Sequence, residues 1–372
     1  MITLVAGTRP NFVKVAPIWR ALRARNVVVR LLHTGQHTGE AMSDVFFRDL
    51  GLPATDVKLE TAGGSQAAQT AAILVGVEAD LVAHRPSALV VVGDVTSTLA
   101  AALAAAKLCI PIVHVEAGLR SGDWTMPEEI NRVVTDRVSD LLLTSSVDDA
   151  ANLRAEGIPA ERISHVGNVM IDSLRHAVEH PTDIVSRLGL ARGGYAVVTL
   201  HRPANVDTAG TMIATLEALT AISSRTAAVF PAHPRTVTNA EAFGLGGRFR
   251  QLPGLCVVEP LGYSDFITLL SESRFAATDS GGIQEETTVL GIPCLTLREG
   301  TERPVTVSEG TNTIVGNDVA RLSHEISEIL AGRGKRGRIP DGWDGHAGER
   351  IAVAIRRFLD GAPPPRSGRP VA

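Results

Sequence analysis

The chain has 372 residues, of which 44% are hydrophobic and 20% charged, and its formal net charge is −4. This composition is typical of a globular protein of about two domains and excludes an intrinsically disordered chain. The slightly acidic charge and the 4% of aromatic residues argue against nucleic-acid binding, which needs a basic surface or a stacking platform.

Short apolar, β-branched segments alternate with amphipathic helical segments along the first half of the chain. The predicted strands lie at residues 2–7, 27–35, 88–94, 110–118, 140–146 and 162–167. Predicted helices separate them, for example at residues 11–24 and 95–108. Continuous apolar strands with intervening helices indicate a parallel sheet that is covered on both faces.

A polar segment at residues 179–194 interrupts this alternation, which then restarts. The predicted strands of the second half lie at residues 195–201, 227–233, 255–261, 275–280 and 292–297. We therefore expect an α/β protein with two doubly wound, Rossmann-like domains, at residues 1–178 and 195–345. The proline-rich residues 362–372 are expected to form a disordered tail.

The N-terminal segment and the longest apolar stretch predict a cytoplasmic protein without membrane association. The first apolar run lacks a basic region before it and ends at Arg9 and Pro10, unlike a secretion signal. Residues 99–106 meet Lys107 long before the roughly 20 residues of a membrane span. The three cysteines form no CxxC pair, which argues against disulfides and a thiolate zinc site (Cys109, Cys256 and Cys294).

Polar residues follow the predicted strands directly at six places, in both halves of the chain. These are Arg9, Asp94, Glu116, His201, His233 and the pair Asp279 and Ser280. Ligands of open α/β sheets bind beyond the carboxyl ends of the strands. The pattern therefore predicts two half-sites that face one cleft between the domains.

Two segments have the character of anion-binding sites. Arg9 and Lys14 lie at a strand-to-helix turn, where a helix N-terminus already favours anions. In DSGGIQEE, the backbone of Ser280, Gly281 and Gly282 can cradle a diphosphate, and Glu286 can accept hydrogen bonds from ribose hydroxyls. The alternatives are a solvated basic pair and an ordinary glycine-containing helix cap.

Carboxylates and histidines supply the candidate acid and base groups. Glu128 and Arg132 lie four residues apart on a helix that Pro127 opens, an arrangement also expected of a surface salt bridge. Glu116 differs because it ends an apolar run, where a carboxylate is partly desolvated. His201 and His233 end successive strands of the second half and are expected near the same phosphate-binding helix.

Several common motifs are absent. No GxGxxG follows the first strand, so no dinucleotide cofactor is indicated, and no GxSxG elbow is present. His114 and Glu116 have the HxE spacing of zinc deaminases, but no PCxxC accompanies them. The sequence therefore predicts neither a metal nor another cofactor.

The motifs together resemble a known family. GTRPNFVKVAP, TGQH, GDVTSTLAA, HVEAGLRSGD, MPEEINR, TLHRPANVD, HPRT, DSGGIQEETTVLGIPCLTLRE and TERP occur in the order seen in bacterial non-hydrolysing UDP-N-acetylglucosamine 2-epimerases. The resemblance runs from about residue 3 to residue 316. It implies the GT-B fold, a C-terminal helix at about residues 346–361 that packs back on the first domain, a UDP-sugar substrate and a homodimer.

The resemblance also implies roles for individual residues. Asp94, Glu116, Glu128 and His201 fall on catalytic positions. Substrate-binding positions are Arg9, Lys14, Arg132, His233, Phe266, Ser280, Gly281, Gly282, Glu286 and Arg303, with Phe266 expected against the uracil. Gln36 and His37 fall on a regulatory site of some members, but Ala68 stands where those members carry arginine. Allosteric activation by substrate is therefore not expected.

The implied reaction is the reversible conversion of UDP-GlcNAc into UDP-ManNAc. Loss of UDP from C1 builds positive charge on the sugar and acidifies the C2 hydrogen, which leads to a 2-acetamidoglucal intermediate. This route needs cations and helix N–H groups on the diphosphate and carboxylates near the sugar. Alternatives are a hydrolysing epimerase that releases ManNAc and UDP, a GT-B glycosyltransferase, and a non-catalytic nucleotide-sugar sensor.

Overall fold

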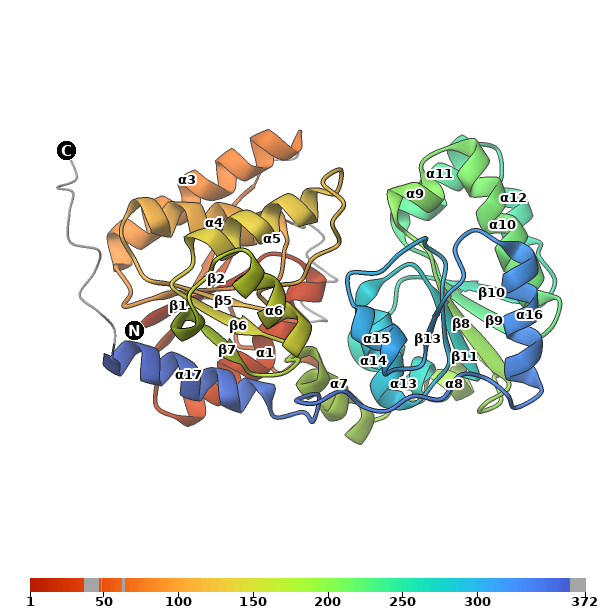
Figure 1. The fold of residues 1–372 in the computed structure, drawn as a ribbon. Coiled ribbons are helices and arrows are strands. Elements are labelled where there is room, and N and C mark those ends of the chain that lie inside the picture. Colours follow the sequence, from red (N-terminus) through yellow and green to blue (C-terminus); the bar gives the residue numbers. More distant parts are fainter. Residues whose placement is uncertain (37–46, 48, 62–63, 362–372) are drawn as a thin grey trace. The chain divides into compact units, whose positions relative to one another are not determined.

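The computed structural model describes residues 1–361 except residues 37–46, 48, 62 and 63 and the side chain of Arg9. His37 and the tail predicted at residues 362–372 lie outside the described residues. The chain divides into two compact units (Figure 1). The first unit comprises Met1–Ser173 and the residues from Asp341 onward, and the second unit comprises Leu174–Pro340.

The first unit is built on a seven-stranded parallel sheet. Its strands, in chain order, are β1 (Ile2–Ala6), β2 (Val29–His33), β3 (Val57–Lys58), β4 (Leu89–Val92), β5 (Ile112–Val115), β6 (Leu141–Thr144) and β7 (Ile163–His165). The spatial order is β3-β2-β1-β4-β5-β6-β7. The order reverses between β1 and β4, and such a switch point is where doubly wound sheets bind ligands.

Helices cover both faces of this sheet. The described helices of this unit are α1 (Arg9–Ala24), α3 (Gln66–His84), α4 (Thr96–Lys107), α5 (Pro127–Val138), α6 (Val147–Ala155), the 3₁₀ helix η1 (Ala160–Arg162) and α17 (Ala347–Gly361). α7 (Met170–Glu179) begins in the first unit and ends in the second. α4 packs between α3 and α5, and its run of buried alanines allows this close approach. α1 and α17 pack together, as Figure 1 shows.

α17 is fastened to the first unit at its N-terminus. The Asp172 carboxylate accepts hydrogen bonds from the backbone N–H groups of Ala347 (3.1 Å) and Gly348 (2.7 Å), which the helix itself leaves unpaired. A Cβ atom at Gly348 would lie 3.0 Å from the Pro17 carbonyl oxygen of α1, so the two helices approach closely there. Trp343 is buried and its Nε1–H donates to the Ser145 carbonyl oxygen at 3.1 Å.

The second unit repeats the architecture with a six-stranded parallel sheet. Its strands are β8 (Tyr195–Thr199), β9 (Ala227–Pro231), β10 (Leu255–Val258), β11 (Phe275–Thr278), β12 (Cys294–Thr296) and β13 (Asn312–Ile314). The spatial order is β10-β9-β8-β11-β12-β13, so the switch point lies between β8 and β11. His201 follows β8 and Asp279 follows β11, which brings both residues to this switch point.

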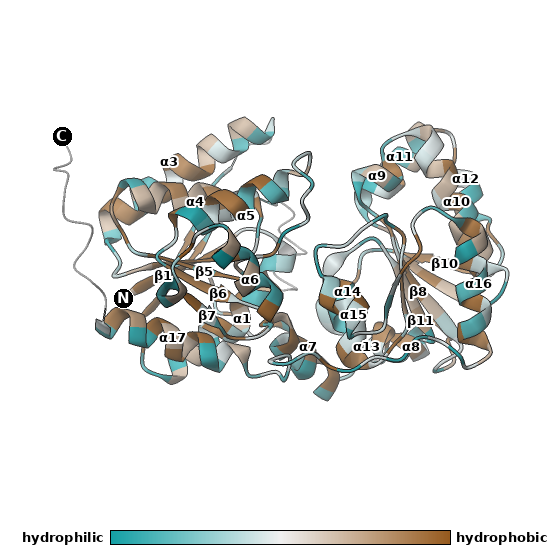
Figure 2. Ribbon diagram, in the orientation of Figure 1, coloured by the Kyte–Doolittle hydropathy of each residue, from teal (hydrophilic) through white to brown (hydrophobic). Residues whose placement is uncertain are grey.

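The helices of the second unit also form two layers. One layer contains α9 (Pro203–Val206), α10 (Ala209–Ser223), α11 (Pro234–Ala242), α12 (Gly246–Arg250) and α16 (Val319–Leu330). The other contains α8 (Ile184–Arg187), α13 (Tyr263–Ser271), α14 (Gly281–Leu290) and α15 (Pro304–Ser308). Figure 2 shows hydrophobic residues concentrated on the strands between the layers, as expected for strands buried on both faces.

The predicted fold class is confirmed, since both units are doubly wound parallel α/β sheets. Every predicted strand contains an observed one, but β3 and β13 were not predicted. These edge strands have only two and three residues and no continuous apolar run. None of the helices in the described part has the length and apolar character that a bilayer crossing requires.

Candidate active site

The first unit buries a cation beside a carboxylate at the carboxyl edge of its sheet. Lys14, on α1, forms an ion pair with Glu116, which directly follows β5. Their side chains are 9% and 5% exposed. Glu116 has a φ of +68°, a left-handed conformation that costs a glutamate energy and is concentrated at functional sites. Lys14 thus contacts a predicted catalytic residue directly.

Asp94 belongs to a second charged group in the first unit. Arg132, from α5, is buried and pairs with Asp94 through one terminal nitrogen. Its other terminal nitrogen lies 2.6 Å from Glu129 Oε2. Glu129, three residues before Arg132, is thus a buried partner of Arg132, and Glu128, which the sequence places on the same helix face as Arg132, is half-buried.

Glu129 was not predicted as a site residue, although it stands in the same MPEEINR motif. Its carboxylate accepts hydrogen bonds from Ser121 N (3.0 Å), Ser121 Oγ (2.9 Å) and Gly122 N (3.0 Å). Burial alone would raise the pKa of Glu129, but these donors and Arg132 lower it. Glu129 therefore stays ionised and fixes Arg132 against Asp94.

His114 and Asp136 form a further buried group that sequence reasoning missed. His114 Nδ1 lies 2.6 Å from Asp136 Oδ1, and His114 Nε2 lies 2.8 Å from the Gly93 carbonyl oxygen. Because both ring nitrogens have protein partners, the HxE spacing at His114 is explained by packing rather than by metal ligation. His114 ties the end of β4, just before Asp94, to β5, just before Glu116.

Side chains also link β1 to β4 at the switch point of the first unit. Asn11 Oδ1 accepts a hydrogen bond from Gly7 N at 3.0 Å, and Asn11 Nδ2 donates to the Val92 carbonyl oxygen at 2.7 Å. Arg9 is the first residue of α1, so its backbone lies at this switch point. Gln36 Oε1 accepts hydrogen bonds from Ser97 N (3.1 Å) and Ser97 Oγ (2.6 Å) at the start of α4.

The second unit brings the two predicted histidines together. The ring centroids of His201 and His233 lie 5.5 Å apart. His201 Nδ1 lies 3.1 Å from Asp279 Oδ1, and His233 Nδ1 accepts a hydrogen bond from Arg235 N at 3.2 Å as the N-cap of α11. The pairing of β8 with β9 brings His201 and His233 together, and the pairing of β8 with β11 brings His201 to Asp279, just before α14.

The N-terminus of α14 is packed against a buried arginine. Ser280 is the N-cap of the helix, and Gly281 and Gly282 form its first two positions. A Cβ atom at Gly281 would lie 2.4 Å from Arg303 Nη1, so only glycine allows the guanidinium this close. Arg303 is held by Glu285, whose Oε1 lies 2.7 Å from its Nε. Ser280 N donates to Thr278 Oγ1 at 2.9 Å, so the cation lies beside the N–H groups of Gly281 and Gly282 at the helix N-terminus, as an oxyanion site requires.

Glu286 lies deeper in α14 and is buried. Its Oε1 accepts a hydrogen bond from the Tyr263 hydroxyl at 3.1 Å. Burial raises the pKa of Glu286 to about 8, with a smaller contribution from the neighbouring charge of Glu285. Phe266, the residue expected against a uracil, lies half-buried on the same helix as Tyr263.

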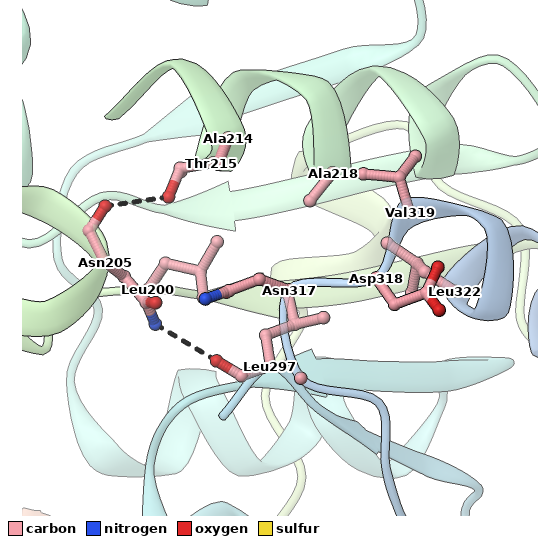
Figure 3. Close-up of a pocket in the computed structure, with 11 residues that line it drawn as sticks. Leu200, Asn205, Ala214, Thr215, Ala218, Leu297, Asn317, Asp318, Val319 and Leu322 are labelled. Atoms are coloured by element: carbon pink, nitrogen blue, oxygen red, sulfur yellow. Dashed lines mark hydrogen bonds between the residues drawn. The ribbon is translucent and has the colours of Figure 1, made fainter. Parts of the chain in front are cut away.

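A small cavity lies behind this site within the second unit (Figure 3). Its volume is about 20 Å³, which leaves room for about one water molecule and not for a sugar nucleotide. Asn205, Thr215 and Leu297 line it, and the dashed lines of Figure 3 mark the hydrogen bonds that Asn205 makes with the other two. The cavity is therefore a gap in the interior packing of the second unit and not a substrate site.

Comparisons with known proteins identify the family of the chain. The family profile described as UDP-N-acetylglucosamine 2-epimerase matches residues 20–356. The UDP-N-acetylglucosamine 2-epimerase of Methanocaldococcus jannaschii is 37% identical over 358 residues, 94% of this chain and 97% of its own length. The UDP-2,3-diacetamido-2,3-dideoxy-D-glucuronate 2-epimerase of Pseudomonas aeruginosa is 40% identical over 320 residues, 85% of this chain and 88% of its own.

A solved structure gives the same result. The crystal structure of the M. jannaschii UDP-GlcNAc 2-epimerase, in complex with UDP-GlcNAc and UDP, superimposes with a TM-score of 0.90. It is 36% identical, and the match covers 96% of this chain and 99% of that one. The predicted resemblance and enzyme class are confirmed: the chain belongs to the UDP-N-acetylglucosamine 2-epimerase family.

Proposed function

We propose that this protein catalyses the reversible C2 epimerisation of UDP-GlcNAc to UDP-ManNAc. The observation that carries the proposal is that one chain has both ionisable groups suited to proton transfer and a site suited to a diphosphate. The first unit has the ionisable residues Lys14, Glu116 and Asp94 at the carboxyl edge of its sheet. The second unit has a helix N-terminus and the buried Arg303, which suit a diphosphate.

The reaction begins with departure of UDP from C1. The C1–O bond breaks, its electron pair passes to the diphosphate oxygen, and positive charge develops on the sugar. Arg303, Arg9, the N–H groups of Gly281 and Gly282 and the Ser280 hydroxyl stabilise the charge on the leaving diphosphate, since the Ser280 N–H itself donates to Thr278 Oγ1. His201 and His233 assist at the same phosphate, while Glu286 binds the ribose and Phe266 packs against the uracil.

Carboxylates then remove the proton from C2 and return one to it. Asp94, Glu116 and Glu128 share the roles of base, acid and charge stabiliser, and Lys14 and Arg132 form ion pairs with two of them. Loss of the C2 proton gives the 2-acetamidoglucal. UDP adds back to C1 after the opposite face of C2 has been protonated, which completes the inversion.

Incubation with UDP-GlcNAc in D₂O tests the proposal directly. We expect UDP-ManNAc by chromatography and deuterium at C2 by mass spectrometry and NMR, with EDTA present and no nicotinamide nucleotide added. Free ManNAc and UDP would show the hydrolysing reaction instead. Unlabelled, unchanged UDP-GlcNAc would contradict the proposal and favour a transferase or a binding protein.

A second candidate substrate is favoured by one comparison. The P. aeruginosa relative, at 40% identity, is a UDP-2,3-diacetamido-2,3-dideoxy-D-glucuronate 2-epimerase. That sugar nucleotide undergoes the same C2 inversion, so the residues named above would serve both substrates. Measurement of kcat/KM for both sugar nucleotides decides between them, and we expect the higher value with UDP-GlcNAc.

We also propose that the enzyme acts as a homodimer. The family resemblance alone supports this proposal, and closed twofold dimers are the commonest assemblies of soluble proteins. Light scattering of the purified protein should give about twice the chain mass of 39.2 kDa. A monomer mass at micromolar concentration would contradict it.

A further inference from the structure

Asp279 is a buried carboxylate beside His201 in the second unit. It follows β11 and is fully buried. Its Oδ2 accepts hydrogen bonds from His201 N (2.9 Å), Arg202 N (2.8 Å) and Asn205 Nδ2 (3.0 Å). Its Oδ1 lies 3.1 Å from His201 Nδ1. Oδ2 therefore accepts the hydrogen bonds of the backbone and amide donors, whereas Oδ1 lies next to the imidazole ring.

The surroundings hold this carboxylate in one orientation. Asn205 Nδ2 also donates to the Leu297 carbonyl oxygen at 3.2 Å, and the Asn205 carbonyl oxygen accepts from Thr215 Oγ1 at 3.0 Å (Figure 3). The adjacent cavity of about 20 Å³ gives these side chains little room to turn. Asp279 Oδ1 therefore stays aimed at the His201 ring.

Asp279 keeps its negative charge in this setting. Burial would raise its pKa, but His201 and the donors at Arg202 and Asn205 outweigh burial, and the pKa is lowered. A permanent carboxylate at Nδ1 stabilises a proton on that nitrogen. The ring of His201 is partly exposed, with 36% of its side chain accessible, so Nε2 is the nitrogen left for a ligand.

We propose that Asp279 is a positioning residue that holds a proton on Nδ1 of His201 and thereby presents Nε2 to the departing diphosphate. The inference rests on the proposed epimerisation. As the C1–O bond breaks and its electron pair passes to the diphosphate oxygen, the doubly protonated ring gives that oxygen its Nε2 proton. The ring is left neutral with its proton on Nδ1, Asp279 remains ionised, and re-addition of UDP reverses the transfer.

The isosteric variant Asp279→Asn separates this role from a purely structural one. In this variant, the three N–H donors that contact Oδ2 would bind the oxygen of the new side-chain amide. The amide NH₂ group would then face His201 Nδ1. A donor there forces Nδ1 to accept, and the ring proton moves to Nε2. The neutral ring can still hydrogen-bond from Nε2 but cannot give that proton up.

Two readouts test the proposal on the full-length protein. Long-range ¹H–¹⁵N NMR of the histidine rings, with His201 assigned by the His201→Gln variant, should show Nδ1 protonated in the neutral wild-type ring and Nε2 protonated in Asp279→Asn. The kcat of Asp279→Asn should fall about 10²-fold or more, with UDP affinity by calorimetry largely kept. Asp318→Asn, which replaces an N-cap carboxylate of α16 with an equally good cap, is the matched control.

The outcomes are distinguishable. A wild-type neutral ring protonated on Nε2 overturns the proposal, as does an Asp279→Asn variant with the kcat of Asp318→Asn. If the wild-type enzyme does not epimerise UDP-GlcNAc, the proposed function fails, and the NMR comparison alone still decides whether Asp279 sets the state of His201.

Discussion

Lys14 and Glu116 form a buried ion pair that joins α1 to the residue after β5. Two charges that are about a tenth exposed or less are costly to bury, and the ion pair offsets part of that cost. Glu116 is also held in a left-handed backbone conformation, so its carboxylate direction is fixed by backbone and partner together.

Replacement of Glu116 by Gln should lower turnover by about 10²-fold or more, because the amide can neither take nor give the C2 proton. UDP affinity should change little, since the diphosphate contacts proposed above lie on other residues. Initial rates with UDP-GlcNAc and calorimetry with UDP measure the two effects. Glu328→Gln, at a partly exposed position of α16, is the control and should match wild type. Near-normal turnover in Glu116→Gln would remove this residue from the mechanism.

Replacement of Lys14 by Met should destabilise the protein by about 3 kcal/mol, because the buried Glu116 carboxylate loses its ion pair with Lys14. The double variant Lys14→Met with Glu116→Gln should recover much of that loss, since no charge is then buried alone. Denaturant unfolding of the wild type, both single variants and the double variant measures the coupling. Additive effects of the two substitutions would show that the pair contributes nothing as a pair.

Replacement of Gly281 by Ala should weaken UDP binding by about tenfold or more. The new Cβ atom, built 2.4 Å from Arg303 Nη1, displaces the guanidinium, and one charge-assisted hydrogen bond is worth about 1.5 to 3 kcal/mol. Gly247→Ala is the control, because Gly247 is a helical glycine of the same unit with open space at its Cβ position. Equal UDP affinity in both variants would place the diphosphate elsewhere.

Glu286 should make the stability of the ligand-free protein depend on pH. Its pKa in the folded chain is about 8, against an ordinary value of 4.5. Below pH 4.5 the carboxyl is protonated in both states. Between pH 4.5 and 8 the unfolded chain releases a proton that the folded chain keeps, so stability falls as pH rises, and above pH 8 the loss is constant.

The Glu286→Gln variant lacks this titration. The Tm of the wild type relative to Glu286→Gln should therefore decline from pH 4.5 to 8 and then level off. Glu328→Gln serves again as the control, because the pKa of Glu328, beside Arg333, is lowered and not raised. Parallel Tm curves for wild type and Glu286→Gln across this range would show that Glu286 is ionised in the folded chain.

The rate of the proposed reaction should depend hyperbolically on UDP-GlcNAc concentration. Ala68 stands in the first turn of α3 at the position where an arginine would complete a second, regulatory site, and Gln36 is engaged with Ser97. Steady-state rates over a wide substrate range check this. A sigmoidal curve would show that activation does not need the arginine.

The sequence was sufficient to predict the fold and the residues that end its strands. Parallel strands buried on both faces are continuous apolar runs, so the residues that follow them are visible without any knowledge of contacts. His201, His233 and Ser280 were predicted in this way, and the pairing of β8 with β9 and β11 brings the ends of these three strands side by side.

The choice of partners inside the site could not be predicted. Arg132 has Glu128 and Glu129 at equally plausible helical spacings, and the sequence does not show that Glu129 is buried against Arg132. His114 and Asp136 are 22 residues apart, and Asp279 reaches a residue 78 positions earlier. Such contacts depend on tertiary packing, for which local periodicity carries no information.

The attachment of α17 to α1 has a consequence for synthesis on the ribosome. The second unit is continuous in sequence, so a nascent chain has all of its strands and helices before the last helix has been made. The first unit is discontinuous, so α17, which Asp172 caps and which packs near Pro17, is made only after the whole second unit. The first unit therefore completes its packing after the second unit has been synthesised, and until then the side of α1 that α17 covers is exposed.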